Sequence, residues 1–392
     1  MANSIPISLS TAVLVWARTS MGYTIEEAAR KAGVSIEQYE AWEAGLRSPT
    51  YKQLENLAYK VFKRPLAFLL LKEPPKDDPI KKDFRNLSNS EIESLSTELR
   101  FALRRAKRFQ NILQDISDER GIGRFKEFKV SIKDKPEIVA HRFRKFINLT
   151  IDIQKSWNHN EAFNNFKSII ESIGIYVFQF KIPMEEARAF CLSGNHPVIV
   201  LNTDDSTNGR IFSLFHETCH IFFNFNGIFR DITTGELNNS YREIEDFCNQ
   251  FAAEVLVPEL DFREELNYRY YAKSHFDDYD IEDLANTFNV SKEVIARKLL
   301  QRSIISTDFF WSRKRYWDAQ ARSFKEAERE RRKKIESKGI AQDIKVTSEK
   351  GKPYIIQVIR AFDQGNITSA DVSNFLEVKL NHLPKIIQRI NS

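Results

Sequence analysis

The chain has 392 residues, too many for one ordinary hydrophobic core, and this length predicts two or three domains. No apolar run approaches the roughly 20 residues that cross a bilayer, and the N-terminus lacks the basic-then-apolar order of a secretory signal, so we expect a cytoplasmic protein without a membrane segment. The 59 basic and 54 acidic side chains are too balanced to indicate a nucleic-acid-binding protein by themselves.

Residues 1–73 predict a bundle of short helices. Three capping boxes divide this segment, each a hydroxyl residue followed three positions later by a side-chain acceptor: Thr24 with Glu27, Ser35 with Gln38, and Thr50 with Gln53. Gly33 lies between the second and third helices, where a left-handed residue allows the sharp corner of a helix-turn-helix. The pattern favours a helix-turn-helix domain, with a compact helical bundle as the alternative.

Residues 74–135 predict a linker and a long helix. The proline-rich stretch 73–79 breaks helical structure, and apolar residues at helical spacing follow from about 90 to 118. Residues 136–310 then mix helices, at 136–146 and 160–172, with the strand-like runs 175–178 and 197–201, which indicates a separate α+β domain.

Residues 311–392 predict a charged helix and a small C-terminal domain. From 312 the sequence is strongly charged, which is typical of a solvated helix or a bridge between domains. The stretch 344–390 predicts one strand and three short helices.

The most informative residues form a His-Glu-x-x-His motif in an apolar helical context, from His216 to His220. One helical turn separates the two histidines, so both imidazoles project from one face and can bind one Zn²⁺. Glu217 lies one position round the helix and can act as the general base for a water molecule that attacks a peptide carbonyl. The alternative is a pair of core histidines satisfied by hydrogen bonds.

A zinc peptidase needs a third protein ligand. Residues 241–256 predict a second helix, on which Glu245 shares a face with Asn249, Ala252 and Leu256. A carboxylate on a buried face is costly unless it is paired or bound to metal, so Glu245 is the expected ligand. An ion pair with Arg210 or Arg242 is the alternative. The acidic residues expected to be solvated instead are Glu243, Asp246 and Glu254.

Three cysteines occur in the chain: Cys191, Cys219 and Cys248. They are odd in number and mostly far apart in the sequence, which argues against a disulfide framework and for a reducing compartment. We expect buried free thiols.

The N-terminal pattern, the segment 212–220 around the motif and the segment 245–258 together resemble the ImmA/IrrE family of metallopeptidases. Elements at 16–18, 42–45, 63–66 and 83–85 are similar to the subgroup fused to a Cro/repressor-like (XRE) domain. The resemblance implies a multidomain, mainly α protein with an α+β zincin-like (gluzincin) domain. It also implies zinc at His216, His220 and Glu245, and cleavage of a partner transcriptional repressor in stress or mobile-element regulation. The family commonly has bulkier or glycine residues at Thr218 and Cys219, neither of which is an expected ligand.

The expected recognition helix, 36–43, turns Glu37 and Glu40 outward, where DNA phosphates would repel them. The residues that remain for DNA contact are Arg47, Thr50 and Lys52 for the backbone and Gln38 for a base edge. We therefore expect weak DNA binding and a protein-interaction or sensing role for this domain.

The leading hypothesis is a zinc endopeptidase that cleaves a regulator protein. An extended substrate is expected to pair with an edge strand, for which 197–202 is the candidate. The alternative is a non-enzymatic DNA-binding repressor or antitoxin that uses the peptidase fold only as a scaffold.

Overall fold

A computed structural model describes residues 9–75, 95–117, 123–226, 228–229, 239–270, 275–335 and 341–391. The protein is mainly helical and divides into two compact units, Met1–Lys107 and Arg108–Ser392. The division falls within the long helix α8 (Thr97–Ile116), the described part of the helix expected at 90–118. The domain limits expected at residues 73, 135 and 310 stay predictions. Among the described residues, no helix is both long and apolar enough to cross a bilayer.

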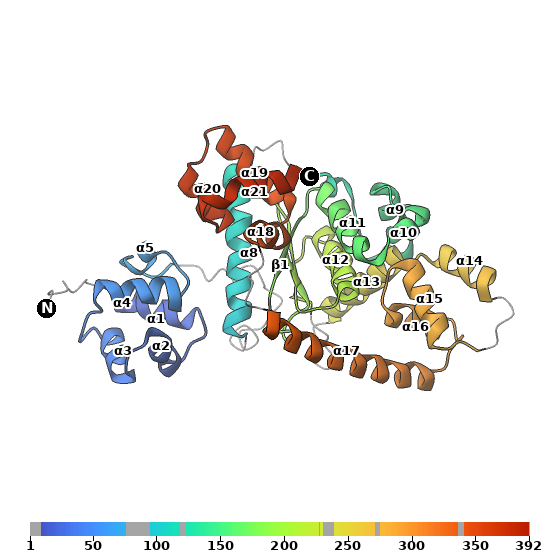
Figure 1. The fold of residues 1–392 in the computed structure, drawn as a ribbon, viewed down its shortest axis with the longest axis horizontal. Coiled ribbons are helices and arrows are strands. Elements are labelled where there is room, and N and C mark those ends of the chain that lie inside the picture. Colours follow the sequence, from blue (N-terminus) through green and yellow to red (C-terminus); the bar gives the residue numbers. More distant parts are fainter. Residues whose placement is uncertain are drawn as a thin grey trace. The chain divides into compact units, whose positions relative to one another are not determined.

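The first unit is a bundle of short helices (Figure 1). They are α1 (Thr11–Thr19), α2 (Ile25–Ala32), α3 (Ile36–Glu43), α4 (Tyr51–Glu55), the π-helical turn η1 (Asn56–Val61) and α5 (Leu66–Leu69). The capping boxes at Thr24 and Thr50 are both complete, whereas Ser35 accepts only the backbone N–H of Gln38. Gly33 has φ 73°, the left-handed conformation that the corner between α2 and α3 requires. The predicted helix-turn-helix geometry is therefore present.

The second unit contains a four-stranded sheet of order β1-β3-β2-β4. Its strands are β1 (Tyr176–Phe180), β2 (Ala189–Leu192), β3 (Val198–Asn202) and β4 (Ile228–Phe229). β1 pairs parallel to β3, and the other two pairs are antiparallel. Every residue of β1, β2 and β3 is buried, so helices must cover the sheet on both faces.

The His-Glu-x-x-His motif and Glu245 lie on two helices of this unit, α12 (Thr207–Phe222) and α13 (Asn239–Leu256), respectively. α12 packs on β2 and β3, and α13 packs between α12 and α9 (Pro136–Phe146). The helices that complete this part of the chain are η3 (Arg124–Glu127), α10 (Ile151–Ser156), α11 (His159–Ser172), α14 (Glu259–Tyr270), α15 (Asp278–Phe288) and α16 (Lys292–Gln301). Figure 1 shows the sheet between α18 on one side and α11 and α12 on the other.

Every secondary-structure element in the described C-terminal residues is a helix. Its helices are α17 (Thr307–Ile335), α18 (Gln342–Lys350), α19 (Lys352–Asp363), α20 (Ser369–Leu376), η4 (Leu380–His382) and α21 (Leu383–Asn391). The charged helix predicted from 312 is therefore confirmed, as part of α17. The strand predicted within 344–390 is wrong, because the apolar residues there, such as Ile355 and Val358, are the buried face of an amphipathic helix.

One further expectation is wrong for a topological reason. The segment 197–202 is not an edge strand, because β3 pairs with β1 on one side and with β2 on the other. Gly209 and Arg210 lie in the first turns of α12, since Ser206 caps the helix by accepting the N–H of Gly209 at 3.0 Å.

Candidate metal centre

The motif helix α12 lies at the centre of the second unit. His216, Glu217 and His220 are at most 1% exposed, and apolar neighbours such as Phe215 and Cys219 are buried as well. A helix that is apolar on nearly all sides is stable only inside a core, and here the sheet and α13 supply that surrounding. Burial of three ionisable side chains is costly unless each is hydrogen-bonded, paired with an opposite charge or bound to a metal ion.

α13 brings Glu245 to both histidines. The Nε2 atoms of His216 and His220 lie 3.0 Å apart, and the Glu245 carboxylate oxygens lie 3.2 Å and 3.1 Å from them, respectively. His216, His220 and Glu245 are the group of side chains, within the described residues, whose donor atoms converge as a metal site requires. The sequence predicted this juxtaposition from one helical turn in α12 and one face of α13.

The donor set fits a tetrahedral zinc ion. Ligands about 2.0–2.1 Å from zinc lie about 3.3 Å from one another in a tetrahedron, close to the separations of 3.0–3.2 Å between these atoms. Two imidazoles and one carboxylate are also a set that catalytic zinc sites use, with a fourth position left for water or substrate.

Charge favours a cation at this point. Burial raises the pKa of Glu245, but hydrogen bonds and electrostatic attraction from His216 and His220 together outweigh burial and leave this pKa below its ordinary value. The pKa of Glu217 shifts in the opposite direction. Its complete burial raises its pKa to about 7, an effect that the nearby His220 and Cys191 reduce. A carboxyl that exchanges its proton near neutral pH is suited to general-base work.

The alternative ion pairs of Glu245 are not formed. Arg210 donates from Nη1 to Gln179 Oε1 at 2.6 Å, and Arg242 is exposed on α13. Glu243 and Asp246 are exposed, as predicted. Glu254 was expected to be solvated, and this is wrong: it is largely buried, and its carboxylate accepts from Lys298 Nζ at 2.6 Å and caps the backbone N–H of Glu259.

All three cysteines are buried and form no disulfide, as predicted, and they lie close to the motif residues or to one another. Cys191 on β2 contacts Glu217, while Cys248 on α13 contacts His220 and Cys219. Asn249 contacts His216 from the same helix. Sequence spacing did not predict the contacts of the thiols with Glu217 and His220. The position of Cys219 within the motif and that of Cys248 directly before Asn249 are the signal that could have placed these two thiols, whereas Cys191 lies on a separate strand.

The end of α13 is fixed by a buried polar network. Gln154 on α10 donates to the carbonyl oxygens of Leu256 and Phe288 at 2.8 Å and 2.7 Å, and Arg144 donates to Val255 O and to Gln154 Oε1, each at 2.6 Å. These bonds satisfy carbonyls that a helix end leaves without partners. They also hold the helix that presents Glu245.

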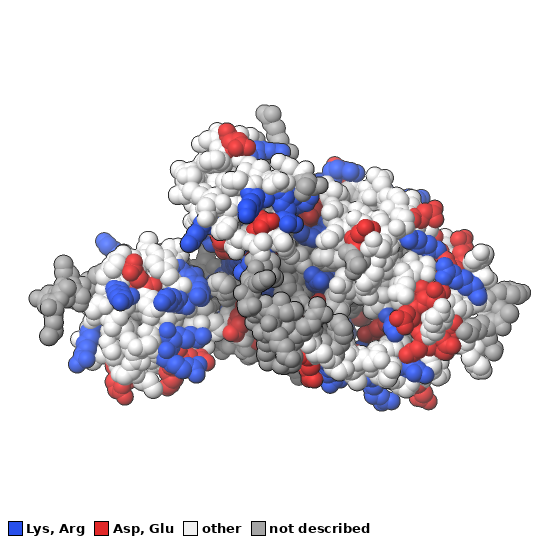
Figure 2. Space-filling model, viewed as in Figure 1, with Lys and Arg blue, Asp and Glu red and all other residues white. Residues whose placement is uncertain are grey.

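The predicted DNA contacts lie in the first unit. Arg47 and Lys52 are exposed, Gln38 is half-buried on α3, and the Thr50 hydroxyl caps α4. On the visible face of this unit, Figure 2 shows acidic side chains at the end where α2 and α3 lie, next to basic ones. This mixed charge is less favourable for a phosphate backbone than a basic face.

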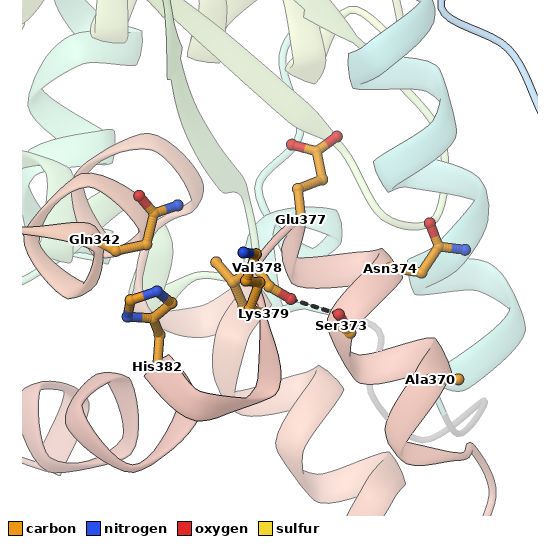
Figure 3. Close-up of a pocket in the computed structure, with 8 residues that line it drawn as sticks. All are labelled: Gln342, Ala370, Ser373, Asn374, Glu377, Val378, Lys379 and His382. Carbon is orange, nitrogen blue, oxygen red and sulfur yellow. Dashed lines mark hydrogen bonds between the residues drawn. The ribbon is translucent and has the colours of Figure 1, made fainter. Parts of the chain in front are cut away.

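A polar groove in the C-terminal helices is a different feature (Figure 3). Its lining includes Gln342, Ser373, Glu377 and His382. The groove lies on α18, α20 and η4, away from the elements that carry the His-His-Glu group. It therefore belongs to another surface of the second unit.

Comparisons with known proteins agree with this architecture. Residues 170–300 match the model of the peptidase M78 family, described as an IrrE N-terminal-like domain, and residues 14–65 match the helix-turn-helix model. A search of curated proteins found no match. The first matched segment contains β1–β3, α12 and α13, and the second contains α2 and α3. The resemblance and the multidomain, mainly α fold predicted from the sequence are confirmed.

Proposed function

We propose that this chain, which combines an M78-type peptidase domain with a helix-turn-helix domain, is a zinc-dependent endopeptidase. The observation that carries the proposal is the convergence of His216, His220 and Glu245 beside the buried carboxyl of Glu217. The family match supports metallopeptidase chemistry, and the donor set supports zinc as the metal.

Each residue then has one task. His216 and His220 bind the metal through Nε2, and Glu245 binds it through its carboxylate. Zinc bound there would polarise a substrate carbonyl and lower the pKa of a water molecule. Glu217 accepts the proton from the attacking water and delivers it to the leaving amine, so the peptide bond is hydrolysed without a covalent enzyme intermediate.

The proposed substrate is a transcriptional regulator of the repressor type. This assignment rests on the resemblance to the ImmA/IrrE family and on the helix-turn-helix domain that accompanies the peptidase domain. The competing hypothesis, a non-enzymatic repressor or antitoxin, gives no reason for a fully buried glutamate beside three metal-type donors.

Metal analysis and a substrate trap test the proposal together. We expect about one zinc per chain in the parent and in Glu217→Gln, and loss of zinc in His216→Ala, because two remaining ligands hold zinc poorly. Glu217→Gln should capture a protein from a cell extract that the parent cleaves and that Glu217→Gln leaves intact.

The matched control is Glu243→Gln, which changes an exposed carboxylate on α13 and should keep both zinc and proteolysis. A parent protein that stays free of zinc in zinc-replete buffer would contradict the enzyme assignment. Loss of zinc in Glu217→Gln would instead make Glu217 a structural residue.

A further inference from the structure

The C-terminal helices are tightly packed against the sheet of the second unit. Phe109, Phe178 and Tyr354 come from α8, β1 and α19, and their ring centroids lie 5.0–5.3 Å apart. Lys350 at the end of α18 is 1% exposed, and its Nζ lies 4.4 Å from the Phe109 ring centroid and 2.8 Å from Glu377 Oε2. A buried ammonium with both an aromatic face and a carboxylate partner indicates a specific contact rather than a loose one.

The turn between α18 and α19 is also fitted to its surroundings. Gly351 has φ +72°, and a Cβ atom there would clash with Glu171 Oε1 on α11 and lie 3.0 Å from the Val177 carbonyl oxygen on β1. Only glycine avoids both the strain and the clash. The C-terminal helices therefore have one defined position on β1 and α11.

One side chain connects this interface to the motif helix. Gln179 on β1 is 4% exposed, and its Nε2 donates to the backbone carbonyl oxygen of Ser348 on α18 at 2.8 Å. Its Oε1 accepts from Arg210 Nη1 on α12 at 2.6 Å. The two ends of a single amide thus join the C-terminal helices to α12.

Arg210 is held closely on its other sides. Its guanidinium carbon lies 4.5 Å from the centroid of the Phe163 ring, and burial lowers its pKa. Arg210 precedes His216 on α12 by less than two helical turns, so its anchorage restricts rotation and sliding of the helix that carries both histidines. Metal affinity depends on such supporting contacts because they fix where the donor atoms point.

We propose that Gln179 is a positioning residue through which the C-terminal helices hold α12. The inference rests on the proposed function only where it concerns zinc, because the bracing of α12 is a property of the protein chain alone. An amide is required at this position. A carboxylate could accept from Arg210 but could not donate to Ser348, and an apolar side chain could do neither.

The test uses the full-length chain with Gln179→Leu and Gln179→Glu. In metal-free protein, we expect amide hydrogen exchange in α12 to be about tenfold faster in both variants, because each has lost at least one buried hydrogen bond that supports the helix. Zinc affinity, measured by competition with a chelator, should be weaker by about tenfold in both. Gln301→Leu, an exposed glutamine at the end of α16, is the control and should match the parent in both measurements.

Each outcome decides the question. Parental exchange in α12 of Gln179→Leu would overturn the inference, whether or not the protein binds zinc. Parental behaviour of Gln179→Glu alone would also overturn it, because the bond to Arg210 would then suffice without the C-terminal helices. If Gln179 acts on α12 through Arg210, the double variant Gln179→Leu/Arg210→Met should change amide exchange and zinc affinity little more than either single variant does. Zinc binding that depends on His216 but not on Gln179 would leave the proposed function intact and remove this inference.

Discussion

Replacing Gln154 by leucine should strongly destabilise the second unit. The Gln154 side chain is fully buried, donates to the last carbonyl of α13 at Leu256 and of α15 at Phe288, and accepts from Arg144. Leucine has a similar volume but leaves all three partners without that bond. At about 1–2 kcal/mol for each buried group, the variant should lose about 3–6 kcal/mol. Thermal unfolding followed by circular dichroism should then show the transition of this unit lowered by about 6 °C or more.

Two controls make the Gln154 result interpretable. Gln301→Leu changes an exposed glutamine and should shift the transition by less than about 0.5 kcal/mol in stability. Gln154→Glu keeps an acceptor for Arg144 but directs carboxylate oxygens at two carbonyl oxygens, so it should be at least as harmful as leucine. A Gln154→Leu transition within about 1 °C of the parent would refute the reasoning, because it would mean that these carbonyls are satisfied without the amide.

Three other predictions follow from the described contacts. Glu245→Gln should weaken zinc binding at least about tenfold in a chelator competition, whereas Asp246→Asn should not, because only the carboxylate of Glu245 faces the histidines. Weaker zinc binding in Asp246→Asn than in Glu245→Gln would mean that α13 is rotated. The protein should bind duplex DNA weakly and with little sequence preference at physiological salt. The double variant Glu37→Lys/Glu40→Lys should bind DNA more tightly in a titration. A nanomolar complex between the parent and an operator would contradict this prediction. Gly123→Ala should destabilise the second unit by about 1–3 kcal/mol in urea unfolding, since the added Cβ would lie 2.5 Å from backbone atoms of Ile173 and Gly174. An unfolding free energy equal to that of the parent would mean that the backbone around Gly123 shifts at little cost.

The sequence was sufficient where chemistry depends on spacing along one helix. The spacing of four residues from His216 to His220 places both imidazoles on one face wherever the helix lies, and the same reasoning selected Glu245 over Asp246 on α13. Caps at Thr24 and Thr50 set helix starts through bonds that span three residues. The roles of His216, His220 and Glu245 in zinc binding and of Glu217 in catalysis remain predictions, whereas the placement of these residues agrees with the local pattern.

The local sequence pattern did not predict features that depend on contacts between segments far apart in the sequence. A buried strand and a short buried helix are both brief apolar runs, so 344–390 was partly misassigned, and β2 and β4 were not recognised. Glu254 looked solvated because its partner Lys298 lies 44 residues away on another helix. Whether β3 lies at an edge depends on which strands pair with it, and β2 was not foreseen as its second neighbour.

The amino-acid sequence by itself therefore determined the local placement of the candidate ligands and of the helix starts, because ligand spacing, helix capping and the left-handed turn at Gly33 are encoded within a few consecutive residues. Only the tertiary structure decided which groups surround the candidate ligands. It placed the thiols of Cys191 and Cys248 beside the motif, and it linked Gln179 to both α12 and the C-terminal helices. These contacts join residues from 26 to 169 positions apart, and such pairings arise from packing of whole elements around a shared core rather than from local backbone preference.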